Sequence, residues 1–198
     1  IVAELRTLRP DVVLNTINGD SNVHFFRALH AAGLGDIPVV SFSVAEDGLA
    51  AIGPENFHPN HYAVWNYFQS LPGAANQRFV DAFRARLGGD RVTSDPVEAA
   101  YIGVRLWAQA VRDAGSDDAE AVNLAMAVQS IAGPSGIVAV DPRTRHLWKH
   151  VRVGKARADG QFDQVWAGID ALRPAPFPDY RSRAEWQGFV ANLAEAGW

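Results

Sequence analysis

Short apolar runs flank an amphipathic segment in the first part of the chain. Residues 11–16 and residues 37–43 are rich in aliphatic and β-branched side chains, which predicts two short buried strands. Between these runs, large apolar residues recur at the spacing of one helix face: Phe25, Phe26, Leu29 and Ala32. A strand, a helix and a strand over this length predict a βαβ unit with parallel strands and a right-handed crossover.

The middle of the chain is expected to form one more strand, followed by helices. Residues 62–68 are an aromatic strand candidate, and helical periodicity covers three later segments: 74–89, 95–115 and 117–130. At the start of the second helical segment, we expect Asp95 to be the capping residue. Pro96 would then occupy the first helical position, and Glu98 would stand at capping-box spacing.

Turn and strand signals dominate the chain after residue 133. The Asp159-Gly160 pair predicts a tight β-hairpin turn, which we assign to type I′. A proline-rich stretch over residues 173–180 is followed by a last helix, where Ser182 and Glu185 have capping-box spacing.

The first residues of the chain also have helical spacing, at Ile1, Val2, Leu5 and Leu8. The chain has no initiator Met and no recognisable signal peptide. We therefore expect a fragment that begins inside a helix, and its cellular location cannot be inferred from a leader sequence.

Composition and charge exclude several classes of protein. The chain has 198 residues, a net charge of −4 and no cysteine. Scattered Lys and Arg residues argue against nucleic-acid binding, which would require a clustered basic face. No apolar run is long enough to span a bilayer, so no direct membrane insertion is expected from this segment. Disulfides and thiolate chemistry are excluded.

The sequence contains no convincing catalytic or metal-binding motif. Nucleophile-elbow, phosphate-loop and dinucleotide-binding patterns are all missing. The closely spaced pairs His58/His61 and His146/His150 lack further ligands at metal-site spacing, so surface or hydrogen-bonded histidines are favoured. The acidic residues at 117–120 fit the first turn of a helix, where the helix dipole favours them. We therefore expect no catalytic residue, no metal and no cofactor.

Two tryptophans need separate interpretations. Trp107 is placed on the apolar face of the helix after Pro96, near Ile102. Trp65 lies in a strand with polar neighbours, so it fits either core packing or the lining of a hinge or cleft.

A polar turn follows each of the first two predicted strands. Ligands of open parallel sheets bind beyond the carboxyl ends of the strands, and both turns would open on one crevice if the strands are neighbours. Asn18, Ser21 and Ser43 can donate or accept hydrogen bonds, and Glu46 can accept from an amine or amide. This mixture suits a small, neutral, polar ligand with a carbonyl and N–H groups. Because Asn, Gly, Asp and Ser also favour turns and caps, a purely structural role stays open.

The string "PDVVLNTINGDSN" resembles the second-lobe βα turn of urea and short-chain-amide substrate-binding proteins of ABC transporters. These are type I periplasmic binding proteins, related to branched-chain amino-acid binders and to an amide-sensing regulator. Further resemblance is carried, in order, by "SFSVAE", "AVWNYFQS", "DPVEAAYIGVRLWAQAV" and "HLWKHVRVGKARADGQFDQVW". The resemblance implies an α/β fold with a partial, parallel, doubly wound sheet and a C-terminal β-hairpin.

The resemblance also implies a two-lobed clamp with hinge strands between the lobes. Residues 1–66 would belong to the second lobe, residues 67–148 would supply helices to the first, and residues 149–198 would return to the second. By position, the ligand-side candidates are Asn18, Gly19, Ser43, Val44 and Glu46. To these we add Ser21 from the turn itself, and we place the hinge at Trp65 and Asn66.

The function implied is reversible binding of urea, a short-chain amide or an amino-acid-like solute, without catalysis. Glu46 resembles the acidic residue with which branched-chain binders hold an amino group. The partner would be an ABC permease, and the location would be periplasmic or extracellular. The helix after "RPAPFP" departs from the family pattern, so a ligand-sensing domain that acts on a signalling output module remains an alternative. A small α/β hydrolase is a further alternative, although we find no nucleophile and base for it.

Overall fold

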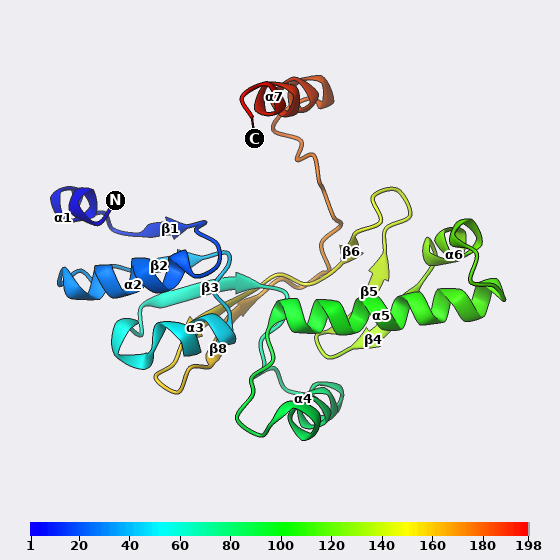
Figure 1. Cartoon of the computed structure of the whole chain (residues 1–198), viewed down its shortest axis with the longest axis horizontal. Coiled ribbons are helices and arrows are strands. Elements are labelled where there is room, and N and C mark those ends of the chain that lie inside the picture. The colour runs from blue at the N-terminus through cyan, green and yellow to red at the C-terminus, as the bar shows by residue number, and fades with distance from the viewer. Residues whose placement is uncertain (198) are drawn as a thin grey trace.

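The computed structural model describes residues 1–197, and their strands form two sheets (Figure 1). The larger sheet has five strands in the order β1-β2-β3-β7-β8. Its members are β1 (Val13–Asn15), β2 (Val39–Ser41), β3 (His61–Trp65), β7 (Arg152–Ala156) and β8 (Phe162–Ala167). The first three strands are parallel, and β3, β7 and β8 pair antiparallel.

The smaller sheet is antiparallel and lies against a long helix. It consists of β4 (Ser130–Gly133), β5 (Gly136–Val140) and β6 (Leu147–Trp148). Helices α5 (Asp95–Ala114) and α6 (Ala119–Met126) directly precede its strands along the chain. Ile102 and Leu106 of α5 pack with Val138 and Val140 of β5 in a separate small core. This half of the molecule lies beside the larger sheet in Figure 1.

The larger sheet carries most of the buried apolar residues. Its helices are α1 (Val2–Leu8), α2 (Ser21–Ala31) and α3 (Glu46–Ile52), with the 3-10 turn η1 (Pro54–Asn56). Phe26 and Leu29 of α2 pack with Val39 of β2 because the helix places its apolar face on the sheet. Helix α4 (Ala74–Leu87) adds Phe79 and Val80 to the same core.

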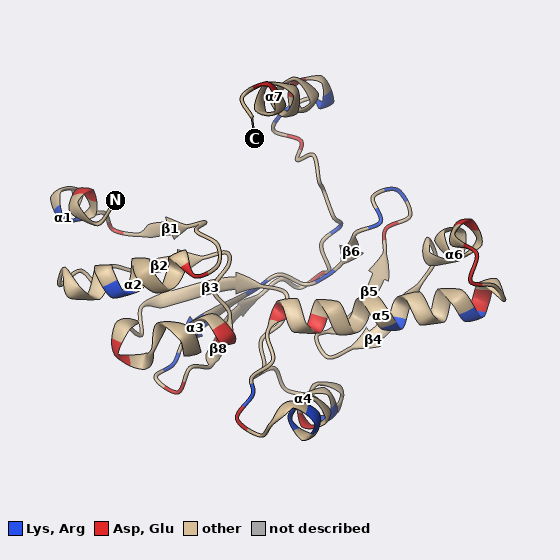
Figure 2. Ribbon diagram, in the orientation of Figure 1, with Lys and Arg blue, Asp and Glu red and all other residues tan. Residues whose placement is uncertain are grey.

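The last helix, α7 (Arg183–Glu195), stands apart from both sheets in Figure 1. Its start has the predicted capping box, because Ser182 Oγ accepts from Glu185 N and the Glu185 carboxylate accepts from Ser182 N. Figure 2 shows residues of both charge signs spread over many elements of the chain.

The predicted α/β fold, its parallel βαβ unit and the β7–β8 hairpin are all confirmed. The type I′ assignment of the hairpin turn is wrong. Arg157 N donates to Gln161 O (2.8 Å), which closes a three-residue loop, and Gly160 has a positive φ (78°) whereas Asp159 does not. A loop of this length needs the left-handed conformation at its last residue, which glycine adopts without strain.

Three further expectations are corrected. Strand β3 ends at Trp65, because Asn66 makes side-chain contacts with residue 150 in place of ladder bonds. Ser94 and not Asp95 is the N-cap of α5, so Pro96 is the second helical residue. Trp107 is 53% exposed, because the buried stripe of α5 follows i, i+4 spacing from Ile102 and passes beside it.

Candidate functional site

The carboxyl ends of β1 and β2 lie side by side. Asn15 pairs with Ser41 in the parallel register, and Phe42 N continues the ladder by donating to Asn15 O (3.1 Å). The adjacency predicted for the two strand ends is therefore confirmed. The loop before α2 and the loop before α3 consequently leave the sheet at the same end, where the parallel strands have their carboxyl ends (Figure 1).

Buried amides and hydroxyls join the two loops to one another. Asn15 Nδ2 donates to Asn22 Oδ1 (2.8 Å) and to Ser41 Oγ (3.0 Å). Asn22 Nδ2 donates to the carbonyl of Ile17 (2.7 Å), and the hydroxyl of Ser43 donates to the same carbonyl. Asn15, Asn22 and Ser41 are almost fully buried. We call Asn15, Asn22, Ser41 and Ser43 the loop network, because together they hold the two loops in one arrangement.

The polar tips of the two loops differ in exposure. Asn18, Gly19 and Ser21 are exposed, and Ser43 is half-buried. Gly19 has a φ of 62°, a left-handed conformation that a residue with a Cβ adopts only at a cost, and its carbonyl accepts from Asn22 N (3.0 Å). The turn can therefore present Asn18 and Ser21 while the amide of Asn22 faces inward.

Val44 and Glu46 are buried; Val44 is bonded to the last residue of β3, and Glu46 is bonded to the chain that follows β3. Trp65 Nε1 donates to the carbonyl of Val44 (2.8 Å), and Gln69 N donates to Glu46 Oε1 (2.7 Å). Trp65 is partly buried and also packs against the larger core. The loop after β2 is thus fastened to the segment where the sequence resemblance places the hinge.

Glu46 combines complete burial with an incomplete set of partners. Its side chain is 0% exposed, and its second oxygen, Oε2, has no hydrogen-bond partner among the described residues. Burial raises the pKa of the Glu46 carboxyl from 4.5 to about 7, although the N–H of Gln69 acts in the opposite direction. This carboxyl can therefore change its charge near neutral pH.

Three chain segments run side by side between the two sheets, and we call residues 66–67, 149–151 and 168–172 the crossing. Asn66 Nδ2 donates to the carbonyl of His150 (2.8 Å). Gly168 N donates to Val151 O (2.9 Å), and Leu172 N donates to Lys149 O (2.9 Å). The assignment of Trp65 and Asn66 to a hinge stays a prediction, as do the lobe boundaries.

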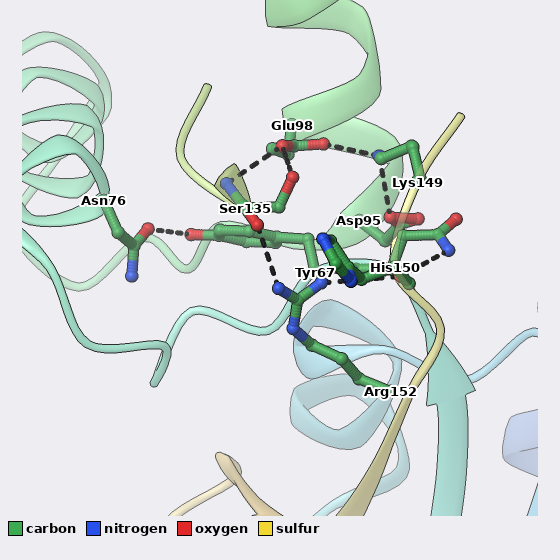
Figure 3. A network of polar contacts seen from close by, with 9 residues as sticks. Tyr67, Asn76, Asp95, Glu98, Ser135, Lys149, His150 and Arg152 are labelled. Carbon is green, nitrogen blue, oxygen red and sulfur yellow. Dashed lines mark hydrogen bonds and ion pairs between the residues drawn. The ribbon is translucent and has the colours of Figure 1, made fainter. Parts of the chain in front are cut away.

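An ionic cluster lies at the crossing, and Figure 3 shows it with Tyr67 and Asn76 beside it. Lys149 Nζ contacts Glu98 Oε2 at 2.7 Å and Asp95 Oδ1 at 3.5 Å. The hydroxyl of Ser135 donates to Glu98 Oε1 (2.6 Å). Glu98 therefore has no capping-box role, because its carboxylate points to Ser135 and Lys149. Burial raises the pKa of Asp95, and the nearby ammonium of Lys149 opposes that rise.

Local sequence patterns do not indicate this cluster or the buried part of the loop network. Glu98 matched a capping box by local spacing, while Lys149 lies 51 residues away along the chain. Asn15 had a usable signal, since an amide at the end of an otherwise apolar strand needs a buried partner.

None of the six ligand-side candidates lines any of three cavities elsewhere in the molecule, of about 610, 1160 and 690 Å³. Residues 1–197 contain no group of three or more His, Cys, Asp or Glu side chains arranged to hold a metal ion. Within the same residues, no helix has the length and apolar character needed to cross a membrane.

The family of the chain follows from a match over most of its length. Residues 1–183 match the family model described as the periplasmic binding protein domain, and the chain belongs to this family.

Solved structures of solute-binding proteins share the fold. One is an ABC-transporter solute-binding protein from R. palustris in complex with benzoate, with 24% identity and a TM-score of 0.75 over 87% of this chain and 47% of that one. An amino acid ABC-transporter substrate-binding protein from Pseudomonas fluorescens Pf-5 has 22% identity and a TM-score of 0.72, over 90% of this chain and 48% of that one. A leucine-binding protein from Thermotoga maritima has 17% identity and a TM-score of 0.67, over 84% and 47%.

The chain spans about half the length of each of these structures. The family and these structures are concerned with solute binding and not with catalysis, in agreement with the prediction that the chain is not an enzyme. A curated protein named limonene hydroxylase, from Geobacillus stearothermophilus, is 32% identical over 116 residues, which cover 59% of this chain and 21% of that protein. That segment is too small a part of the hydroxylase to carry its activity over.

Proposed function

We propose that this chain supplies one side of the site at which a two-lobed binding protein holds a small polar solute for ABC-type uptake. Urea, short-chain amides and amino-acid-like molecules are the first candidates. The proposal places the protein in the periplasm or outside the cell, with an ABC permease as its partner. Binding is reversible and closes the two lobes around the solute.

The observation that carries the proposal is the pairing of the β1 and β2 ends. Two loops leave one edge of a parallel sheet and are tied together by the loop network. Their exposed tips retain hydrogen-bonding groups at Asn18 and Ser21, and Ser43 is half-buried beside them.

The chemistry of these tips favours a neutral ligand. Asn18, Ser21 and Ser43 are uncharged; Asn18 and Ser21 can both donate and accept a hydrogen bond, whereas Ser43, whose hydroxyl already donates to the Ile17 carbonyl, can accept one. A urea or amide group offers one carbonyl acceptor and N–H donors, so it can satisfy both kinds of partner. The buried carboxyl of Glu46 does not face these tips; it holds the start of α3 to the chain after β3 by accepting from Gln69 N.

Calorimetric titration of the intact protein with urea, acetamide, leucine and 4-hydroxybenzoate tests the proposal. We expect binding of urea or acetamide, and at least about tenfold weaker binding after Asn18→Ala, which removes one hydrogen-bonding side chain (about 1.4 kcal/mol). The matched control is Asn123→Ala, at an exposed position of α6. Preferential binding of leucine or 4-hydroxybenzoate would replace the amide assignment. Equal affinities of wild type and Asn18→Ala would remove this turn from the site.

A sensing role is the second candidate, and α7 is the observation that favours it. The family match ends at residue 183, where α7 begins with its own capping box. The helix stands apart from the sheets (Figure 1). Its residues Phe189 and Val190 are exposed. A sensor would use such a helix to reach an output module. Deleting residues 182–198 of the intact protein would then abolish a ligand response in the cell without changing solute affinity, whereas uptake by a transporter would persist.

A further inference from the structure

Arg152 makes a forked contact with main-chain carbonyls of its own segment and of two segments distant along the chain. Its Nη1 donates to the carbonyls of Asn66 and His150, and its Nη2 donates to the carbonyl of Ser135 (2.9 Å). Figure 3 shows its guanidinium between Ser135 and the crossing. Every one of these acceptors is a main-chain oxygen. The contact therefore constrains the path of the chain and not merely the rotamer of another side chain.

The acceptors of the fork belong to different halves of the molecule. Arg152 begins β7 of the larger sheet, and Asn66 directly follows β3 of the same sheet. Ser135 stands in the turn between β4 and β5 of the smaller sheet. A rotation of one sheet against the other would change the distance from the guanidinium to Ser135.

The far end of the fork is itself held rigidly. Glu98 Oε1 accepts from both the hydroxyl (2.6 Å) and the N–H (3.3 Å) of Ser135. The other oxygen of Glu98 is bound by Lys149, and the Glu98 side chain is fully buried. If Arg152 moved and the β4–β5 turn moved with it, the contacts of Glu98 on α5 with Ser135 and with Lys149 of the crossing would be disturbed.

We propose that Arg152 is a positioning residue that sets the angle between the two sheets, and so the spacing of the surfaces that close on a solute. The second clause rests on the proposed solute-binding function, whereas the first does not. Lysine could preserve the charge but not the fork, since it has one nitrogen in place of a planar group with several N–H donors.

The test measures the separation of the two halves, which changes with the angle between the sheets, and it needs no solute. Cysteines introduced by His24→Cys on α2 and Arg112→Cys on α5 carry spin labels in the intact protein, and these 198 residues contain no competing cysteine. Double electron–electron resonance then gives the distribution of distances between the halves. Arg152→Lys is expected to broaden or shift this distribution relative to the labelled wild type.

Arg157→Lys is the matched control. Arg157 also contacts two partners, but both of them, Asp159 and Asp163, lie in the β7–β8 hairpin itself. Its replacement is expected to leave the distance distribution unchanged. A folded Arg152→Lys protein with the wild-type distribution would overturn the proposal, and so would equal broadening in Arg157→Lys.

Ser135→Ala gives an independent route if Arg152→Lys does not fold. This change frees the β4–β5 turn from the hydroxyl contact with Glu98, so it should broaden the distribution in the same sense by a smaller amount. An unchanged distribution would count against the proposal. Once a solute is known, Arg152→Lys should change its affinity by about fivefold or more. Failure of binding alone would contradict the proposed function and leave the measured angle standing.

Discussion

The loop network and the ionic cluster at the crossing solve similar problems with different chemistry. The loop network joins two loops of one sheet through neutral amides and hydroxyls of Asn15, Asn22, Ser41 and Ser43. The ionic cluster joins α5 to the crossing through charged side chains, where Lys149 contacts Asp95 and Glu98, and beside it Arg152 joins the larger sheet to Ser135 of the smaller one.

The difference also separates two roles. Neutral groups can be buried at a moderate cost when they are hydrogen-bonded, and they impose no charge on a nearby ligand. A buried ion pair has a large desolvation cost and tolerates the loss of one partner poorly. We therefore expect the crossing to respond to substitution more strongly than the loops, whereas the loops should affect ligand binding more directly.

The largest effect is expected for Glu98→Ala. The change leaves Lys149 without its closest carboxylate and removes the acceptor of Ser135. We expect a loss of about 3–5 kcal/mol in the free energy of unfolding, measured by urea denaturation. The exposed Glu120 of α6 is the control, and Glu120→Ala should change stability by less than about 1 kcal/mol. Equal losses in the two variants would show that the cluster contributes no special stability.

Glu46→Gln tests the buried carboxyl that links the start of α3 to Gln69, in the chain that follows β3. Because its folded-state pKa of about 7 lies above the ordinary value of 4.5, the folded protein retains the proton through this window. The free energy of unfolding should therefore fall as pH rises from about 4.5 to about 7, by up to about 3 kcal/mol. Glu46→Gln should lack this fall. Denaturation curves at pH 5 and pH 8 measure it, and identical pH dependence in both proteins would contradict the assignment.

Asn15→Ala should have a smaller effect, of about 1–3 kcal/mol, because it removes three hydrogen bonds, to Asn22, to Ser41 and from the N–H of Ile17. Thermal denaturation measures the loss, with Asn123→Ala as the exposed control. Solute affinity should fall as well, since the loop network holds the candidate tips. If Asn15→Ala weakens stability but not binding, the loop network supports the sheet alone.

Arg157→Ala is expected to have the smallest effect. Its side chain is 42% exposed, and its partners Asp159 and Asp163 are more exposed still. Surface ion pairs of this kind contribute about 0–1 kcal/mol. A loss comparable to that of Glu98→Ala, measured by the same denaturation assay, would remove the contrast between exposed and buried ion pairs.

The parts of the fold that could be predicted depend on local patterns. The apolar runs before Thr16 and Ser43 and the amphipathic segment between them give the βαβ unit, because periodicity reports directly which face is buried. The capping box at Ser182 was readable for the same reason, since all its atoms lie within one helical turn. The adjacency of the two candidate loops followed from the parallel unit.

The rest depends on contacts between residues far apart in the sequence. Glu98 fits a capping box as well as an ion pair, and only the fold brings Lys149 to it. Glu46 stands in the first turn of α3, where an acidic residue is normally exposed and favoured by the helix dipole, so its sequence gives no sign of burial. The forked contact of Arg152 is directed at main-chain carbonyls, which no sequence pattern marks.

The central claim is that the loops after β1 and β2 contact a small polar solute. A crystal structure of the intact protein, grown with the solute that binds most tightly in calorimetry, tests this claim most directly. We predict that polar atoms of the solute lie within hydrogen-bonding distance of Asn18, Ser21 or Ser43, with the loop network intact behind them. A solute held entirely by other residues, with these three side chains facing solvent, would contradict the account.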